Sequence, residues 1–170
     1  MKIQIIGYSG SGKSTLAKLL GENLNIPHLH LDRVHFYGDW QERTIEEQSS
    51  IVSEFIKKNE EWVIDGNYSA VARERFSMAD LTIFLDFNRF TCYWRSLKRY
   101  LKHRGKTRDS LGCIEKFDLE FQWWILHQGR TKKRKIKMME NFNLNIGRKM
   151  IFKNQRALNK WLKEFLNKGE

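Results

Sequence analysis

The feature that most constrains the fold is a glycine-rich segment near the start of the chain, GYSGSGKS, which spans Gly7 to Ser14. It fits the pattern GxxxxGK(S/T) of the Walker A motif, or P-loop. The motif follows the apolar run 2–6, which predicts a strand, and precedes residues 15–20, whose apolar side chains share one helical face. The motif therefore stands in the strand–loop–helix context that it requires.

Each residue type in this loop suits the binding of a nucleoside triphosphate. Gly7, Gly10 and Gly12 lack a β-carbon, so the backbone can reach positive φ and point its amide hydrogens at an anion. The following helix adds the partial positive charge of its N-terminus, Lys13 can reach the β- and γ-phosphates, and the Ser14 hydroxyl can ligate Mg²⁺. The predicted nucleotide-binding residues are Gly7, Ser9, Gly10, Ser11, Gly12, Lys13, Ser14 and Thr15. The predicted cofactors are ATP and Mg²⁺, and the alternative is a glycine-rich turn that binds no ligand.

The size and composition of the chain fit one globular domain. Its 170 residues can bury a substantial core, and 41% of them are hydrophobic. No apolar run approaches the ~20 residues that a membrane-spanning helix needs, and the N-terminus leads into the predicted strand rather than a signal peptide. Cys92 and Cys113 are far apart and fit a reduced protein. We expect a single cytoplasmic domain over residues 1–170, without a membrane partner.

Positive charge is concentrated in one part of the chain. The net charge is +11, and the segment 89–135 alone contains 14 Lys or Arg against 4 Asp or Glu, a net +10. Such a surface can serve phosphate-rich small substrates, weak non-specific nucleic-acid binding, or solubility alone. The densest run, 130–135, is more typical of a solvent-exposed helix face than of a nucleic-acid contact.

Four further apolar runs predict strands that complete a parallel sheet: 28–32, 61–65, 81–86 and 148–152. Ligands bind at the carboxyl edge of such sheets, where Asp32 and Asp65 end their predicted strands. We expect Asp65 to hold Mg²⁺ through water, together with Ser14, and Asp32 to face a substrate. The alternative for each is a carboxylate that only shapes a turn.

Histidines and arginines near these strand ends allow two interpretations each. His28, His30 and His35 could suggest a metal site, but alternation along a strand separates their side chains and favours ordinary histidines. Arg73 and Arg75 could reach substrate anions or face solvent.

Helical patterns connect the predicted strands. Thr44 and Glu47 form a capping-box pattern that begins one helix. The aromatic residues of the preceding loop, 33–40, could stack on a flat substrate or pack against that helix. The pattern over 115–141 predicts a long helix that is interrupted at Gly129.

A further helix follows the fourth predicted strand. The residues that we expect in its core-facing stripe are Phe90, Trp94, Leu97 and Leu101. Near the C-terminus, Asn154 is expected to cap a last amphipathic helix.

Four phrases of the sequence resemble the bacterial DNA topology modulation proteins, the FlaR-like family of P-loop NTPases. They are LDRVHFYGDW, WVIDGNY, ADLTIFLD and CYWRSLKRYLKHRGKTR. The family is similar to adenylate, shikimate and gluconate kinases. The resemblance implies a three-layer α/β/α fold, with a five-stranded parallel sheet in the order 2-3-1-4-5 and a helical lid. It also implies a substrate-binding segment at 33–60 and a lid at about 104–119.

The resemblance extends to individual site residues. It places Arg95, Arg104 and Arg108 in and before the lid, as catalytic candidates beside Lys13 and Asp32. Shikimate-type kinases place an Asp against the acceptor hydroxyl in the region of Asp32. In adenylate kinases the third-strand Asp is followed by Gly-Phe-Pro-Arg. Here Asn67, Tyr68 and Ser69 replace the last three residues, so the arginine that grips an acceptor phosphate is absent from its place.

The sequence as a whole predicts an ATP-binding, Mg²⁺-dependent kinase that acts on a small molecule, nucleoside or nucleotide. The partners of such an enzyme would be a nucleoside triphosphate and a small-molecule acceptor. The alternative is a DNA-topology-related or other nucleic-acid-binding regulatory protein with little turnover.

Overall fold

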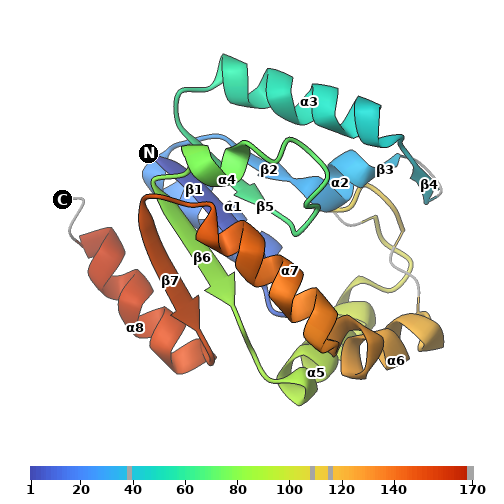
Figure 1. Cartoon of the computed structure of the whole chain (residues 1–170). Coiled ribbons are helices and arrows are strands. Elements are labelled where there is room, and N and C mark those ends of the chain that lie inside the picture. Colours follow the sequence, from blue (N-terminus) through green and yellow to red (C-terminus); the bar gives the residue numbers. More distant parts are fainter. Residues whose placement is uncertain (38–39, 108–109, 115–116, 168–170) are drawn as a thin grey trace.

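The computed structural model describes residues 1–37, 40–107, 110–114 and 117–167. Its strands are β1 (Lys2–Gly7), β2 (His28–His30), β3 (Phe36–Tyr37), β4 (Gln41–Glu42), β5 (Trp62–Asp65), β6 (Leu81–Leu85) and β7 (Arg148–Phe152). Its helices are α1 (Lys13–Leu24), α2 (Leu31–His35), α3 (Ile45–Lys58), α4 (Arg75–Met78), α5 (Arg89–His103), α6 (Leu119–Leu126), the 3-10 helix η1 (Gln128–Arg130), α7 (Lys132–Asn143) and α8 (Gln155–Leu166). Figure 1 shows how they are arranged.

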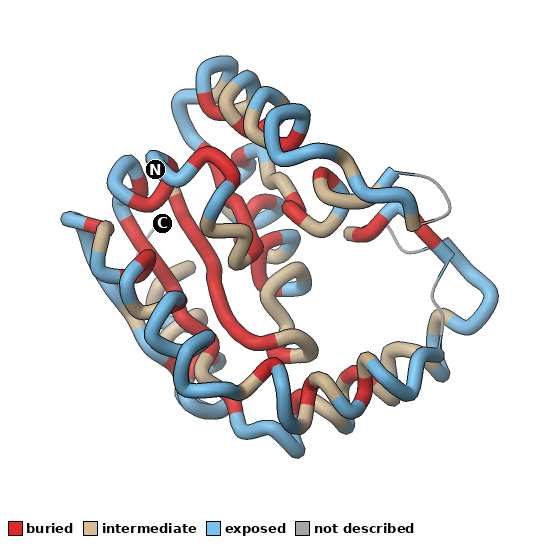
Figure 2. Tube along the Cα trace, turned by 45° about the vertical axis from the view of Figure 1, so that its right-hand side comes forward, coloured by how far each residue is buried: buried red, intermediate tan, exposed pale blue. Residues whose placement is uncertain are grey.

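Five of these strands form one parallel sheet in the order β2-β5-β1-β6-β7. When the strands of this sheet are numbered along the chain, the order is 2-3-1-4-5, so the predicted α/β fold is confirmed. Strands β3 and β4 form a separate antiparallel hairpin. The central strands are buried along their length (Figure 2). Burial on both faces explains why their sequences are almost continuously apolar.

The sheet register shows which helices cover each face. Phe84 contacts Phe142 of α7. Phe84 pairs with Ile151 of β7, and the next residue of that strand, Phe152, contacts Trp161 of α8. Because successive side chains of a strand point to opposite faces, α7 and α8 lie on opposite faces. By the same reasoning α1 lies on the α8 face, and α3 and α4 on the α7 face. Three layers result, as predicted.

Local capping signals in the sequence are realised. Thr44 accepts a hydrogen bond from the Glu47 amide, and the Glu47 side chain accepts one from the Thr44 amide. Asn154 caps α8 through the amide of Ala157. The predicted interruption at Gly129 falls in η1, between α6 and α7.

Several expectations about local structure are wrong. Strand β2 ends at His30, so Asp32 lies in the first turn of α2 and not at a strand end. The helix expected from residue 115 begins at Leu119, because the Asp118 carboxylate caps the amides of residues 120 and 121. Between α5 and α6, the described residues contain an isolated bridge between Thr107 and Ile114 and no helix.

The prediction that the apolar stripe of α5 faces the core is also wrong. Phe90 is 63% exposed, Trp94 58% and Leu101 65%. The buried side of the helix instead carries Cys92 and Ser96. Periodicity shows that one face of a helix is apolar, but it does not show whether another element of the same chain covers that face.

None of the helices in the described part of the chain is long and apolar enough to cross a membrane.

Candidate active site

The P-loop connects β1 to α1 at the carboxyl edge of the sheet. Gly7, Gly10 and Gly12 have φ values of 152°, 77° and 96°, in the region that favours glycine. A β-carbon on Gly7 would lie 2.7 Å from the Leu85 carbonyl oxygen, and one on Gly10 would clash with the carbonyl of Cys92. Glycine is therefore required at both positions by backbone conformation and by close packing.

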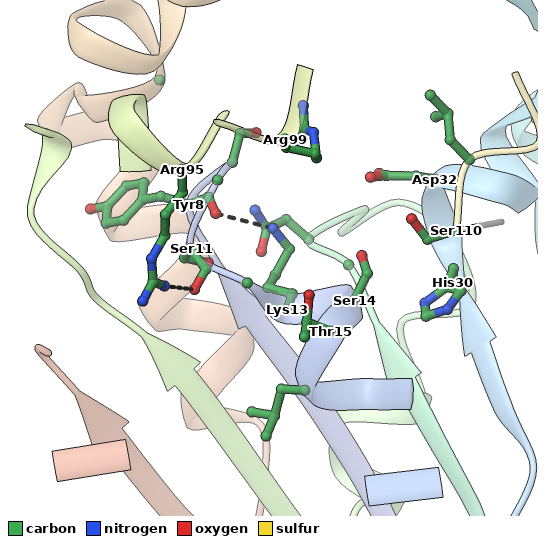
Figure 3. Close-up of a pocket in the computed structure, with 18 of the residues that line it drawn as sticks. Tyr8, Ser11, Lys13, Ser14, Thr15, His30, Asp32, Arg95, Arg99 and Ser110 are labelled. Atoms are coloured by element: carbon green, nitrogen blue, oxygen red, sulfur yellow. Dashed lines mark hydrogen bonds between the residues drawn. The ribbon is translucent and has the colours of Figure 1, made fainter. Parts of the chain in front are cut away.

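Polar groups of the loop are arranged as an anion site would need. Lys13 Nζ lies over the loop and donates to the Tyr8 carbonyl oxygen at 3.1 Å (Figure 3). The Ser11 hydroxyl is 1% exposed and has no hydrogen-bond partner in the described part of the chain. A buried hydroxyl without a partner is costly unless a ligand supplies one. The loop therefore fits a bound phosphate group.

Asp65 joins the P-loop helix to β2. Its Oδ2 accepts a hydrogen bond from Ser14 Oγ at 2.9 Å, and its Oδ1 hydrogen-bonds with His30 Nδ1. The carboxylate is 2% exposed. The structure thus brings together the two predicted Mg²⁺ residues, and hard oxygen donors of this kind fit Mg²⁺. His30 was not predicted to contact them.

A metal site made of the histidines is not formed. Over residues 1–37, 40–107, 110–114 and 117–167, no group of three or more His, Cys, Asp or Glu is placed to hold a metal ion. His28 contacts His30 ring to ring, with centroids 5.1 Å apart. Burial, followed by the neighbouring His30, lowers the pKa of His28 below its ordinary value.

Asn67 holds the first glycine of the P-loop. Its Oδ1 accepts from the Gly7 amide at 3.0 Å, and its Nδ2 donates to the Gly7 carbonyl at 2.7 Å. One side chain therefore satisfies both polar groups of a residue whose backbone position shapes the loop. Sequence reasoning missed this role, although the position of Asn67 two residues after Asp65, at a strand end, was a usable signal.

Asp32 lies on α2, across the cavity from Arg95 (Figure 3). Tyr68 donates its hydroxyl to Asp32 Oδ1 at 2.9 Å. Burial, and next the charge of Asp32, raise the pKa of Tyr68 well above its ordinary value. Tyr68 thus stays a neutral donor, which fixes the direction of this hydrogen bond and orients the carboxylate.

Arg75 is an interior support for the same loop. It is 0% exposed and donates to Gln4 Oε1 at 3.1 Å, to the Tyr68 carbonyl at 3.0 Å, and to the carbonyls of Val71 and Ala72. Burial lowers its pKa to about 9, so the guanidinium remains charged at neutral pH. Neither alternative given for Arg75 holds, since it faces neither a substrate nor solvent. Arg73 is exposed.

The three arginines expected in and before the lid have different positions. Arg95 donates to the Ser11 carbonyl at 2.9 Å and to Gln155 Oε1 at 2.7 Å, so it joins the P-loop to the start of α8. Arg104 is exposed and does not line the cavity. Arg108 lies outside the described residues. Among the described residues of this region, the Lys and Arg side chains that line the cavity are Arg95, Arg99 and Lys106.

One cavity of about 1730 Å³ is lined by residues 8–14 of the P-loop and by Asp32, and by His30, the hydrogen-bond partner of Asp65. On the Asp32 side its wall is aromatic, with His35, Phe36, Trp40 and Tyr68. His35 contacts Tyr68 at 4.9 Å and Phe36 at 4.4 Å between ring centroids. These rings pack on one another and line the cavity, and stacking on a flat substrate stays a prediction.

Residues 131–135 of the basic run are solvent-exposed, as expected. Arg130 departs from that pattern because its guanidinium lies 3.6 Å from the centre of the Tyr8 ring. It also donates to the Phe87 carbonyl at 2.7 Å. The first residue of the run therefore supports the P-loop from behind.

The sheet order and the P-loop between β1 and α1 together define a P-loop α/β fold. The structure is similar over nearly the whole chain to shikimate kinase from Acinetobacter baumannii in complex with shikimate, with a TM-score of 0.59, 16% identity, and coverage of 99% of this chain and 93% of that chain. It is also similar to deoxyadenosine kinase from M. mycoides with bound dATP, with a TM-score of 0.54, 16% identity and coverage of 98% and 100%. Shikimate kinase from Bacteroides thetaiotaomicron gives a TM-score of 0.53, 20% identity and 97% coverage of both chains.

At this level of identity the comparisons show the fold and not the substrate. No protein-family model matches the sequence, and no curated protein matches it either. The resemblance to the topology modulation proteins therefore stays a prediction, whereas the broader assignment to the P-loop kinase fold is confirmed.

Proposed function

We propose that this protein is an ATP-dependent phosphotransferase that requires Mg²⁺ and phosphorylates a hydroxyl group of a small-molecule acceptor. The observation that carries the proposal is that one cavity is lined both by the P-loop, whose Ser14 forms a hydrogen-bonded pair with Asp65, and by the Asp32–Tyr68 pair. The first pair fits the donor triphosphate, and the second fits an acceptor hydroxyl. Shikimate kinase and deoxyadenosine kinase share the fold, which supports a kinase.

The donor half would be held by the glycine-rich backbone, Lys13 and Ser14. Bound Mg²⁺ neutralises charge on the transferred phosphoryl group and orients it. Ser14 and, through water, Asp65 are the residues that would hold the ion. Arg95 contacts the P-loop backbone and Gln155, so it would border a nucleotide bound at the P-loop.

The acceptor half would be organised by Asp32. A carboxylate within reach of the acceptor hydroxyl can orient it and accept its proton as the new bond to phosphorus forms. Tyr68 holds that carboxylate in place, and the aromatic wall excludes water from the acceptor. An acceptor that itself carries a phosphate is less favoured. The side chain of Asn67 is engaged in two hydrogen bonds with Gly7, and Ser69 stands where adenylate kinases have the arginine that grips the acceptor phosphate.

Arg104 and Arg108 remain proposals for charge stabilisation by the lid. Arg104 does not line the cavity in this structure, so its role requires Arg104 to move toward the P-loop. Replacing Arg104 by Ala should lower turnover without changing nucleotide affinity if that movement occurs.

The test is phosphoryl transfer from Mg-ATP to a panel of nucleosides, nucleotides and small polyols, followed by product detection. A product whose formation falls by orders of magnitude in Lys13→Ala, but not in the surface control Lys58→Ala, supports the proposal. Asp32→Asn should lower turnover strongly and leave nucleotide affinity unchanged. Nucleotide binding without product from any acceptor, together with binding of duplex DNA at low salt, would instead favour a regulatory binding protein.

A further inference from the structure

The outer face of α5 carries an apolar stripe that no other described element covers. The α5 stripe consists of Phe90, Trp94, Leu97 and Leu101, with Leu97 half-buried and the other three exposed. At 100° per residue these four side chains lie within about 60° of one another around the helix. Their spacing of four, three and four residues is the heptad spacing of a helix that packs against another helix.

The helix is held in this orientation by polar contacts on its other sides. Ser96 accepts a hydrogen bond from Gln122 of α6 at 3.2 Å, Arg89 donates to the Leu126 carbonyl at 3.0 Å, and Arg95 binds the P-loop. The stripe therefore cannot turn inward without breaking these bonds. In Figure 1, α5 and α6 lie side by side at the lower edge of the molecule, on the side opposite α3.

The exposed apolar area is large enough to matter. With ~150–250 Å² for each large side chain, the exposed parts of Phe90, Trp94 and Leu101 amount to on the order of 400 Å². A standard interface buries about 800 Å² per partner. The polar flanks of the two helices can supply the rest.

The spacing of the stripe is the same in both directions along the helix. Two copies of α5 that pair antiparallel about a two-fold axis between Trp94 and Leu97 would place Phe90 opposite Leu101 and Trp94 opposite Leu97. Thr91 and Lys98 lie beside the stripe on the same edge of α5. In the antiparallel pair Lys98 of one copy would lie opposite Thr91 of the other, so the two copies of Lys98 would not face one another. Arg95, near the centre of the helix, points to the P-loop and not into the seam.

From this self-match we infer that the α5 stripe is the interface of a symmetric homodimer. Closed two-fold interfaces use the same patch on both subunits, which requires the self-complementarity seen here. Single-stranded nucleic acid, which also binds exposed aromatic and basic side chains, does not account for leucines at heptad spacing. The interface lies on the helix that supplies Arg95, so dimerisation and the P-loop share one structural element.

The first experiment measures the mass of the full-length protein in solution. Light scattering after size exclusion should give twice the 20.4 kDa chain mass at micromolar concentrations. Trp94→Glu should raise the dissociation constant of the dimer at least 100-fold. Ile45→Glu, which places the same charge on a 52% exposed residue of α3, should leave that constant unchanged. A monomer at all concentrations, or a dimer indifferent to Trp94→Glu, overturns the inference. Unchanged circular dichroism in both variants establishes that each is folded.

A second experiment tests the antiparallel arrangement. Thr91→Cys and Lys98→Cys proteins should cross-link when they are mixed under oxidation and not when each is alone; the native Cys92 and Cys113 are buried. A dimer without this cross-link overturns the arrangement.

The dependence on salt separates the homodimer from nucleic-acid binding. Self-association between two cationic helices should strengthen with added salt, whereas binding to nucleic acid should weaken. A monomer that binds an oligonucleotide through Trp94 would assign the face to nucleic acid instead.

Discussion

The clamp of Asn67 on Gly7 gives the sharpest test of how the P-loop is held. In Asn67→Ala, the Gly7 amide and carbonyl lose hydrogen bonds of 3.0 and 2.7 Å. Each such bond contributes ~0.5–1.5 kcal/mol net, so the pair contributes ~1–3 kcal/mol. If that energy holds the loop in its binding conformation, the Kd for Mg-ADP should rise about 5- to 150-fold.

Isothermal titration calorimetry with Mg-ADP measures this change directly. Ser69→Ala is the matched control, because Ser69 lines the same cavity from the same loop and makes no hydrogen bond to the P-loop. Asn67→Asp should be at least as damaging as Asn67→Ala, since it keeps the acceptor and places a charge against the Gly7 carbonyl. An Asn67→Ala protein that melts at a lower temperature but binds Mg-ADP within about twofold of the parent would refute the reasoning, because the clamp would then serve folding alone.

Two further predictions concern stability. Gly10→Ala should lower the urea midpoint of unfolding by more than Gly105→Ala: both glycines have positive φ, which costs other residues ~1–3 kcal/mol, but only Gly10 lies against another backbone, at Cys92. Equal effects of the two changes would contradict the packing argument. Burial lowers the pKa of His28, so its contribution to stability is complete above pH 6.5 and is lost as the pH falls through the folded pKa. His28→Gln should therefore flatten the decline in melting temperature below pH 6.5, and an unchanged slope would exclude His28 as a cause.

The conformation of the P-loop could be predicted well from sequence because its signals are local. Gly10, Lys13 and Ser14 act through backbone conformation and through a helix that begins within the motif itself. The same holds for the Thr44 capping box, whose two partners are three residues apart. Where the determinants of a structure lie within a few residues, the pattern contains most of the information.

Features that depend on distant packing could not be read in this way. Arg75 has the composition of a surface residue, yet it is buried because Gln4 and three carbonyls of the preceding loop satisfy its donors. The apolar side chains of Leu29 and Leu31 predict a strand that ends at Asp32. In the structure Leu31 belongs to α2 and packs into the core from that helix. In α5 the apolar stripe was correctly identified as a stripe, but its burial depends on a partner outside the helix.

The loop that follows β5 connects the two halves of the proposed site. Asp65 contacts Ser14 at the start of α1, Asn67 contacts Gly7 at the end of β1, and Tyr68 contacts Asp32 on α2. Arg75 binds the Tyr68 carbonyl from the interior and, through Gln4, is tied to β1. Because four consecutive residues set the P-loop and the Asp32 carboxylate at once, a shift of this loop would move the donor and acceptor sites together. A rigid support behind the loop is therefore expected, and a buried charged side chain with several carbonyl partners provides one.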